Sequence, residues 1–339
     1  TVMGRSRAAL TTFARSRRLA AGIAAVGLAA VVACGDDARS SADDADTGLT
    51  EPPEGTARVA HERELRGAWI ATVHNSTWPS RPGLDPPAAK AELLRIFDAL
   101  TEAHLNVVFL QVRPESDALY ASRIEPWSRF LTGTQGEDPL WDPLAFAVEE
   151  GHRRGLEVHA WLNPYRALVS ASSEAASSHL TKTMPEATRS YGAQRWMDPG
   201  VPAVRRHILD VIRDILARYA VDGIHFDDYF YPYPVSGASF DDAASYADYA
   251  ASGGRLAKDA WRRSNVDALV RETAALVSSA RQDVRFGVSP FGIYRPGEPP
   301  GITGLDAFAT LHCDPVLWMN EGWVDYLAPQ LYWPTTQAA

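Results

Sequence analysis

The sequence has little of what several common protein functions require. No Gly-rich phosphate loop follows the first predicted strand, which weakens the case for a dinucleotide-binding protein. No HxH, HExxH or other tight ligand spacing is present, which disfavours a catalytic metal site. Lys and Arg number 33 against 42 Asp and Glu, a net charge of −9, and no basic patch follows the first eighteen residues. Nucleic acid is therefore not an expected partner, because neutralising phosphates needs clustered cations.

Cysteine is also scarce, with Cys34 and Cys313 alone in 339 residues. Residues 1–34 have the pattern of an export signal, with arginines first and then an apolar run over 19–33 that is too short for a comfortable permanent span. The run ends in VVAC, which resembles a bacterial lipobox, so we expect Cys34 to carry lipid. The alternative is a cleaved secretory signal in which Cys34 is incidental. Cys313 is then left without a partner and is expected to be a small buried apolar side chain.

Residues 35–63 are expected to form a disordered linker. Gly, Asp, Ser, Ala and Pro dominate this stretch, and its aspartates repel one another. A lipid anchor followed by a linker would place the remaining chain at the cell envelope, on the periplasmic or extracellular face of a membrane.

From residue 64 the pattern changes to strands that alternate with helices. The predicted strands are residues 67–73, 106–112, 156–162, 224–226, 285–288 and 324–331. The predicted helices are residues 88–103, 143–154, 204–219, 261–281 and 314–321. Strands that are apolar throughout, each followed by a helix, indicate a parallel sheet with helices outside it.

The parallel sheet could be open and doubly wound or closed into a barrel. Polar residues stand at the carboxyl end of every predicted strand, where a barrel enzyme builds its site: His74, Arg113, Asn163, Asp227, Ser289 and Gln330. We therefore predict a (β/α)8 TIM-type barrel over residues 64–339. Six strands are present and a closed barrel needs eight, so we expect the chain to be truncated, with two more strand–helix units beyond Ala339.

The stretch DGIHFDDYFYP (222–232) is the main candidate for chemistry. It combines a buried strand, two adjacent carboxylates and a run of aromatic rings, which suits acid/base chemistry on a sugar. Asp227 is predicted to be the ionised catalytic partner, on the same strand face as His225. The acid is left open between Asp228, Glu115 and a residue in the missing part. Glu115 could instead pair with Arg113, and His225 could be a satisfied core histidine.

Other polar and aromatic residues are candidate substrate contacts. Trp161, Tyr231 and Trp78 are candidate stacking rings, although packing is an equal alternative for Trp161. Arg113 could instead be a strut between strands. The Ala/Ser-rich residues 170–190 are expected to form a loop over the site. The predicted substrate-binding residues are Arg113, Asn163, Tyr165, His225, Tyr229, Ser289, Gln330 and Trp333.

Several segments in order resemble the glycosyl-hydrolase-like 10 family, whose members are bacterial and often lipid-anchored and include a divisome-localised peptidoglycan glycosidase. The segments are LRGAW (65–69), QVRP with DALY (111–120), HAWLNPYR (159–166), DGIHFDDYFYP (222–232), GVSPFG (287–292) and DYLAPQLYW (325–333). Glu115 and Ser116 depart from the pattern, where an acidic–glycine pair is expected. The resemblance implies a (β/α)8-type barrel that hydrolyses glycosidic bonds of a polysaccharide, without a cofactor.

Three functions remain open at this point. The first is a lipid-anchored glycoside hydrolase on peptidoglycan or a related polysaccharide, with Asp227 as nucleophile or base, or orienting the substrate's own N-acetyl group. The second is a non-catalytic glycan-binding or scaffolding protein on a barrel. The third is a metal-dependent deacetylase that would use His74, His225, Asp227 and His312.

Overall fold

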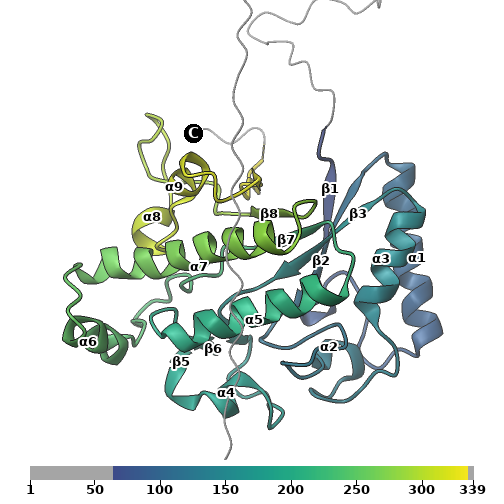
Figure 1. The fold of residues 1–339 in the computed structure, drawn as a ribbon, viewed down its shortest axis with the longest axis horizontal. Coiled ribbons are helices and arrows are strands. Elements are labelled where there is room, and N and C mark those ends of the chain that lie inside the picture. Colours follow the sequence, from purple (N-terminus) through teal and green to yellow (C-terminus); the bar gives the residue numbers. More distant parts are fainter. Residues whose placement is uncertain (1–63, 335–339) are drawn as a thin grey trace, which may run out of the picture. The chain divides into compact units, whose positions relative to one another are not determined.

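The computed structural model describes residues 64–334, which are built on one parallel β-sheet (Figure 1). Its strands are β1 (Gly67–Ile70), β2 (Val107–Arg113), β3 (Glu157–Leu162), β7 (Gly223–Phe226), β8 (Arg285–Val288) and β9 (Tyr326–Leu327). Each strand pairs in parallel with the strand of this sheet that precedes it in the chain. The strands therefore lie across the sheet in chain order, without the reversal of strand order that a doubly wound sheet has. The predicted barrel-type architecture is confirmed over these six strands.

Helices fill the connections between the strands. The long ones are α1 (Pro86–Glu102), α3 (Pro143–Arg153), α5 (Pro202–Arg218) and α7 (Lys258–Ala280). The shorter ones are η1 (Val73–Asn75), α2 (Arg129–Thr132), α4 (Leu180–Thr183), η2 (Pro185–Ala187), α6 (Ala243–Ala251), α8 (Ala307–Thr310) and α9 (Pro315–Asn320).

Aspartate–proline pairs fix where three of the helices begin. The Asp85 carboxylate accepts a hydrogen bond from the Ala88 amide at 2.7 Å, and Asp142 does the same for Ala145 at 3.1 Å. Asp314 caps α9 in the same way. A proline follows each aspartate, and its fixed φ suits the first helical position.

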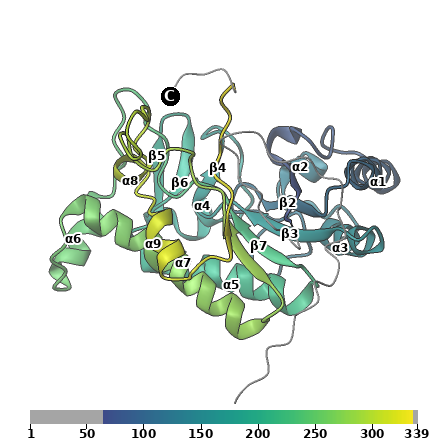
Figure 2. The same cartoon turned by 90° about the horizontal axis from the view of Figure 1, so that it is seen from above.

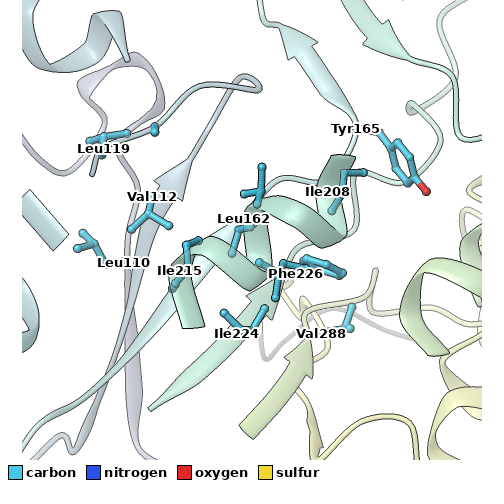
Figure 3. Packing of buried hydrophobic residues seen from close by; sticks show 14 of the residues in the cluster. Leu110, Val112, Leu119, Leu162, Tyr165, Ile208, Ile215, Ile224, Phe226 and Val288 are labelled. Carbon is cyan, nitrogen blue, oxygen red and sulfur yellow. The ribbon is translucent and has the colours of Figure 1, made fainter. Parts of the chain in front are cut away.

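The outer face of the sheet forms the main hydrophobic core with α5. The buried residues of α5 recur at helical spacing: Val204, Ile208, Val211, Ile212, Ile215 and Leu216. Ile208 and Ile215 share a buried cluster with Leu162, Ile224 and Phe226 of the sheet (Figure 3). Each such side chain contributes about 1.5–3 kcal/mol when it leaves water.

The inner face of the sheet is strongly curved. Trp69 of β1 donates from Nε1 to His225 Nε2 of β7 at 3.2 Å, and Tyr326 Oη of β9 lies 3.0 Å from His225 Nδ1. In a flat sheet β1 and β7 would be about 14 Å apart, because neighbouring strands are spaced by about 4.8 Å. Side chains from both ends of the sheet can meet at His225 only if the sheet curls around it.

Two glycines leave room for the rings on this inner face. A Cβ at Gly223 would lie 2.4 Å from His159 Nδ1, and one at Gly287 would lie 2.1 Å from the ring of Tyr326. Any larger residue would therefore displace a ring, so the glycines serve close approach.

A second, antiparallel sheet follows β3 (Figure 2). Its strands are β4 (Arg166–Leu168), β5 (Thr188–Tyr191) and β6 (Gln194–Met197), in the order β4-β6-β5. The prediction of a plain loop over 170–190 is therefore wrong where α4, η2 and the start of β5 lie. The small sheet fixes Arg166 at the start of β4.

Two predicted strands are longer than the observed ones. β1 ends at Ile70 rather than at residue 73, because the amides of Thr72 and Val73 donate to the side-chain oxygen of Gln111 at 2.9 and 3.0 Å and leave the ladder. β9 covers two residues, and its pairing continues only as single bonds from the amides of Ala328 and Gln330.

The predicted signal peptide (1–34), the lipidated Cys34 and the linker (35–63) lie outside the described residues. Within residues 64–334, no helix combines the length and the hydropathy needed to cross a bilayer. Cys313 is fully buried, as its sequence context predicts.

Candidate active site

Asp227, directly after β7, is held by side chains from the end of the neighbouring strand β3. Its Oδ2 accepts hydrogen bonds from Trp161 Nε1 at 3.0 Å and from Asn163 Nδ2 at 3.2 Å. Its Oδ1 accepts from the Tyr229 amide at 3.3 Å. The parallel register explains the encounter, since Trp161 is paired with His225, two residues before Asp227. The structure thus brings Asn163 to Asp227, as the polar strand ends predict.

Burial raises the pKa of Asp227 to about 7, and the negative charge of Asp228 adds to this effect. The positive charge of Arg166 and the hydrogen bonds from Trp161 and Tyr229 act in the opposite direction. Asp227 is 4% exposed. A carboxyl group with a pKa near neutrality can accept a proton, donate one or attack as a nucleophile at physiological pH.

Asp228 is held by different elements. Tyr233, in the connection between β7 and α6, donates its hydroxyl hydrogen to Asp228 Oδ2. Burial raises the pKa of Asp228, and the hydrogen bond from Tyr233 acts in the opposite direction. Adjacent strand residues diverge, so Asp227 faces the end of β3 while Asp228 is held by the loop after β7.

Glu115 is bound in an ion pair with Arg129, which does not support its predicted catalytic role. Its carboxylate has no exposed surface, lies 2.8 Å from the guanidinium of Arg129 and accepts the amide hydrogen of Val169. Burial and the neighbouring Asp117 raise the pKa of Glu115 to about 7. The alternative pairing with Arg113 is also incorrect. Glu115 ties the loop after β2 to α2 and to the end of β4.

Arg113 is a strut and not a substrate contact. Its guanidinium binds the Glu125 carboxylate through two hydrogen bonds of 2.8 and 2.6 Å, and it also donates to the carbonyl oxygens of Asn163 and Pro164. Both side chains are essentially inaccessible to solvent, so neither Arg113 nor Glu125 has a polar group that a substrate could reach. The arginine therefore links the ends of β2 and β3 inside the protein.

Three aromatic candidates are buried away from the carboxylates. Tyr165 is fully buried in the core cluster (Figure 3), so the predicted substrate contact is not supported. Trp78 is also fully buried, donates to the Ala89 carbonyl at 2.9 Å and packs against Trp141. Tyr231 packs on Phe240 and His312. None of these three side chains is accessible enough to stack on a sugar.

His225 is a neutral residue on the inner face of the sheet. It belongs to a hydrogen-bonded group of rings, here called the barrel floor, that also contains Trp69, His159 and Tyr326. An indole can only donate, so His225 Nε2 accepts from Trp69, and the ring proton must reside on Nδ1. Nδ1 then donates to Tyr326 Oη, whose own hydrogen goes to His159 Nδ1 at 2.8 Å. Burial holds the pKa of His225 well below its usual value, in agreement with this tautomer.

Ser289 belongs to the same floor. Its hydroxyl lies 2.9 Å from His225 Nε2 and shares the single lone pair of that nitrogen with the Trp69 indole. The predicted substrate-binding roles of His225 and Ser289 are therefore replaced by a supporting role.

Tyr229, Gln330 and Trp333 stay partly exposed at the carboxyl edge of the sheet. Gln330 donates to the Ser289 carbonyl at 2.9 Å. Trp333 is 37% exposed and packs against Phe291, which also contacts the ring of Tyr233. These three residues remain candidate substrate contacts, whereas Asn163 is fully buried and its side chain binds Asp227 and the Arg166 amide.

A hollow of about 370 Å³ lies beside Trp333. Its other lining residues include Gly292, Tyr294 and Leu331. The rings of Phe291 and Tyr233 connect the Trp333 wall of this hollow to Asp228. The size suits part of a sugar chain.

Arg166 and Tyr233 were not predicted as site residues. Arg166 is 5% exposed, and its guanidinium lies 4.6 Å from the ring centre of Tyr229. Both residues stand in stretches that the sequence marks, Arg166 at the end of HAWLNPYR and Tyr233 just after the aromatic run. Nothing in either stretch shows which member faces the carboxylates.

The four residues of the hypothetical metal site do not gather. His312 packs on Tyr231, His74 lies against Phe130, and His225 is in the floor. In the described part of the chain, no three His, Cys, Asp or Glu side chains are placed to hold one ion. The arrangement does not support the deacetylase hypothesis with these ligands.

Comparison with known proteins identifies relatives of this chain. The family model described as Glycosyl hydrolase-like 10 matches residues 64–339. The chain is 40% identical over 284 residues to "Glycosyl hydrolase YngK" of Bacillus subtilis, covering 82% of this chain and 56% of that protein. It is 35% identical over 318 residues to "Glycosyl hydrolase DigH" of Escherichia coli K12, covering 86% of this chain and 71% of that protein.

A likeness to a solved structure is weaker. An α-L-fucosidase from Paenibacillus thiaminolyticus aligns with 69% of this chain and 33% of its own, at 10% identity and a TM-score of 0.46. The chain spans about half the length of the Bacillus relative. The match of the family model across the whole described region, together with these relatives, shows that the chain belongs to the glycosyl hydrolase-like 10 family.

Proposed function

We propose that this protein hydrolyses glycosidic bonds of a cell-envelope polysaccharide, namely the glycan strands of peptidoglycan. The observation that carries the proposal is Asp227, a nearly buried carboxylate at the carboxyl edge of a barrel-type sheet with a pKa raised to about 7. The family relationship and the relatives named as glycosyl hydrolases support it.

In the proposed reaction, Asp227 is the carboxylate that attacks the sugar or orients the substrate's N-acetyl group. Asp228, the second carboxyl group at this edge, is assigned as the proton donor to the leaving oxygen. Asn163 holds Asp227, and Tyr233 holds Asp228. Tyr229 and Trp333 supply rings on which pyranose faces can pack.

The direct test uses purified glycan strands, with and without stem peptides, and mass analysis of the fragments. We expect products with new reducing ends, each heavier by one water than the corresponding anhydro product. Anhydro ends would indicate a lytic cleavage and contradict hydrolysis. Binding without fragments, in the full-length protein, would favour the non-catalytic alternative. Trapping of a glycosyl ester on Asp227 would separate direct attack from substrate assistance.

We infer that Cys34 carries the lipid that anchors the protein at the cell envelope. The support is the VVAC sequence at the end of the apolar run, which resembles a bacterial lipobox. Stable attachment to a membrane needs more than one acyl chain, so the modified cysteine would have to carry several. In cells fed a clickable fatty acid, the wild-type protein should be labelled and Cys34→Ala should not. Cys313→Ala is the matched control, because that thiol is fully buried, and it should keep the label. Label that persists in Cys34→Ala would refute the anchor.

A further inference from the structure

Two arginines of the described region have almost no exposed surface, and they differ in one respect. Arg113 is bound by the Glu125 carboxylate on two nitrogens. Arg166 forms no ion pair with any carboxylate of residues 64–334, and its side chain donates only to the Pro114 carbonyl, at 3.3 Å from both Nε and one terminal nitrogen. A buried cation without a partner is costly, so folding alone would not favour it.

The position of Arg166 is nonetheless firmly set. Its amide donates to Asn163 Oδ1 at 3.1 Å, and β4 pairs Arg166 with Trp196 of β6. The guanidinium packs on the ring of Tyr229, the residue that follows the two aspartates. The side chain of Asn163 therefore serves both residues: its Nδ2 donates to Asp227, and its Oδ1 accepts from the Arg166 amide.

The unpaired charge of Arg166 lowers the pKa of several acidic groups at once. It acts on Asp227 and Asp228 at the end of β7 and on Glu115 after β2. The pKa of His74 in η1 is lowered by burial and by the positive charges of Arg166 and Arg129. The other groups around Asp227 are the neutral donors Trp161 and Asn163 of the β3 end. Arg166 is thus the cation common to three carboxyl groups and bound to none of them.

We propose that Arg166 is a positioning residue that favours the ionised form of Asp227 without an ion pair, so that no cation is bound to the carboxylate oxygens when the sugar arrives. A direct ion pair would occupy those oxygens, as Arg113 occupies Glu125. A charge held beside them favours the ionised form without blocking it. This role rests on the proposed hydrolysis, but the electrostatic part can be measured without any substrate.

The experiment follows the carboxyl ¹³C signals of labelled aspartates during a pH titration, with Asp227→Asn and Asp228→Asn identifying the peaks. In Arg166→Gln, the midpoint of Asp227 should move up by about 1 to 3 pH units. Arg166→Lys, which keeps a charge but not the planar fork, should stay closer to wild type. Arg205→Gln is the control, because it removes a partly buried guanidinium that is paired with Glu272 on α5 and α7.

An unchanged Asp227 midpoint in Arg166→Gln would overturn the proposal. If the glutamine variant does not fold, Arg166→Met fills a similar volume without needing hydrogen bonds and gives the same test. Activity provides the second readout. The acid limb of the pH profile should move up with the midpoint, so the loss should be about tenfold or more at low pH and small at high pH. An equal loss at every pH would indicate a merely structural role and would also count against it.

The two ways of failing are distinguishable. A shifted midpoint without any glycan cleavage in the wild type would refute hydrolysis and leave the electrostatic role intact. Cleavage by the wild type with an unshifted midpoint would refute the role of Arg166 alone.

Discussion

The Asp227→Asn variant is expected to fold and to lose glycan hydrolysis by about a thousandfold or more. Asparagine keeps the shape of the side chain and an oxygen that can accept from Trp161 and Asn163, whose donor atoms lie 3.0 and 3.2 Å away. It cannot attack, take up a proton or carry the negative charge. The loss should fall on kcat, measured by the rate of reducing-end formation on glycan strands.

Asp267→Asn is a closely matched control. Asp267 of α7 also accepts an indole hydrogen, from Trp318 at 2.8 Å, and burial raises its pKa to about 6. It resembles Asp227 in environment but stands among the helices, so its replacement should leave hydrolysis near the wild-type rate. Full activity in Asp227→Asn, or an equal loss in Asp267→Asn, would refute the assignment of Asp227.

The Asp227→Asn variant should also change how the free energy of unfolding depends on pH. The pKa of Asp227 is raised from 3.8 to about 7 on folding, so ionisation of Asp227 opposes folding. The unfavourable contribution is absent below pH 3.8, grows as the pH rises to 7 and is then constant. It amounts to on the order of 4 kcal/mol, from 7 − 3.8 = 3.2 units at about 1.36 kcal/mol each. Denaturant unfolding should therefore find Asp227→Asn more stable than the wild type at pH 8, and little different at pH 4.

Replacement of Arg113 by methionine should destabilise the protein by about 3–5 kcal/mol. The change leaves the Glu125 carboxylate buried, and among the described residues His207, at 2.9 Å, is then its one remaining ionisable hydrogen-bonding partner. It also removes the donors to the Asn163 and Pro164 carbonyls. If Arg113 were instead a substrate contact, stability would hardly change and KM would rise. Urea unfolding of the variant distinguishes the two roles.

The pH dependence gives the sign of the effect. Arg113 and His207 hold the pKa of Glu125 down at about 2, so the pair stabilises the fold above pH 4.5 and loses that contribution as the pH falls toward 2. The cost of Arg113→Met should accordingly be largest at neutral pH and smaller near pH 4, where Glu125 can bind a proton. The double variant Arg113→Met with Glu125→Leu should recover much of the loss.

An exposed ion pair provides the comparison. Arg285 and Glu157 join β8 to β3 at 2.7 Å, and their side chains are 45% and 37% exposed. Arg285→Met should cost less than about 1 kcal/mol, because solvent screens the pair. A cost for Arg113→Met as small as this would refute the strut.

The strands and long helices could be predicted because their burial leaves a periodic trace in the sequence. β8 occupies residues 285–288 as predicted, and the apolar stripe of α5 is buried as expected. The β4-β6-β5 sheet could not be foreseen, since its strands have three or four residues and stand in a stretch without an apolar run. Its contacts are set by how the chain folds back after β3.

The site was predictable only in part, for a related reason. Parallel strands end at one edge, which is enough to place Asn163 beside Asp227. The direction of a side chain beyond the strand end depends on the path of the loop, so Tyr165 turned into the core and Glu115 toward Arg129. Arg166 stands outside any pattern, because its role comes from the absence of a partner, which a sequence does not show.

The hydrogen-bonded rings of the barrel floor have a consequence for proton traffic. A relay needs members that can accept as well as donate. The indole of Trp69, at one end of the run through His225, Tyr326 and His159, cannot accept, and the Ser289 hydroxyl at the same end bonds only to His225 among the described residues. No hydrogen bond among the described residues joins these rings to Asp227. The carboxyl group must therefore exchange its proton with water on the side from which the sugar arrives. Each departing product would then reopen the route by which Asp227 is reset for the next turnover.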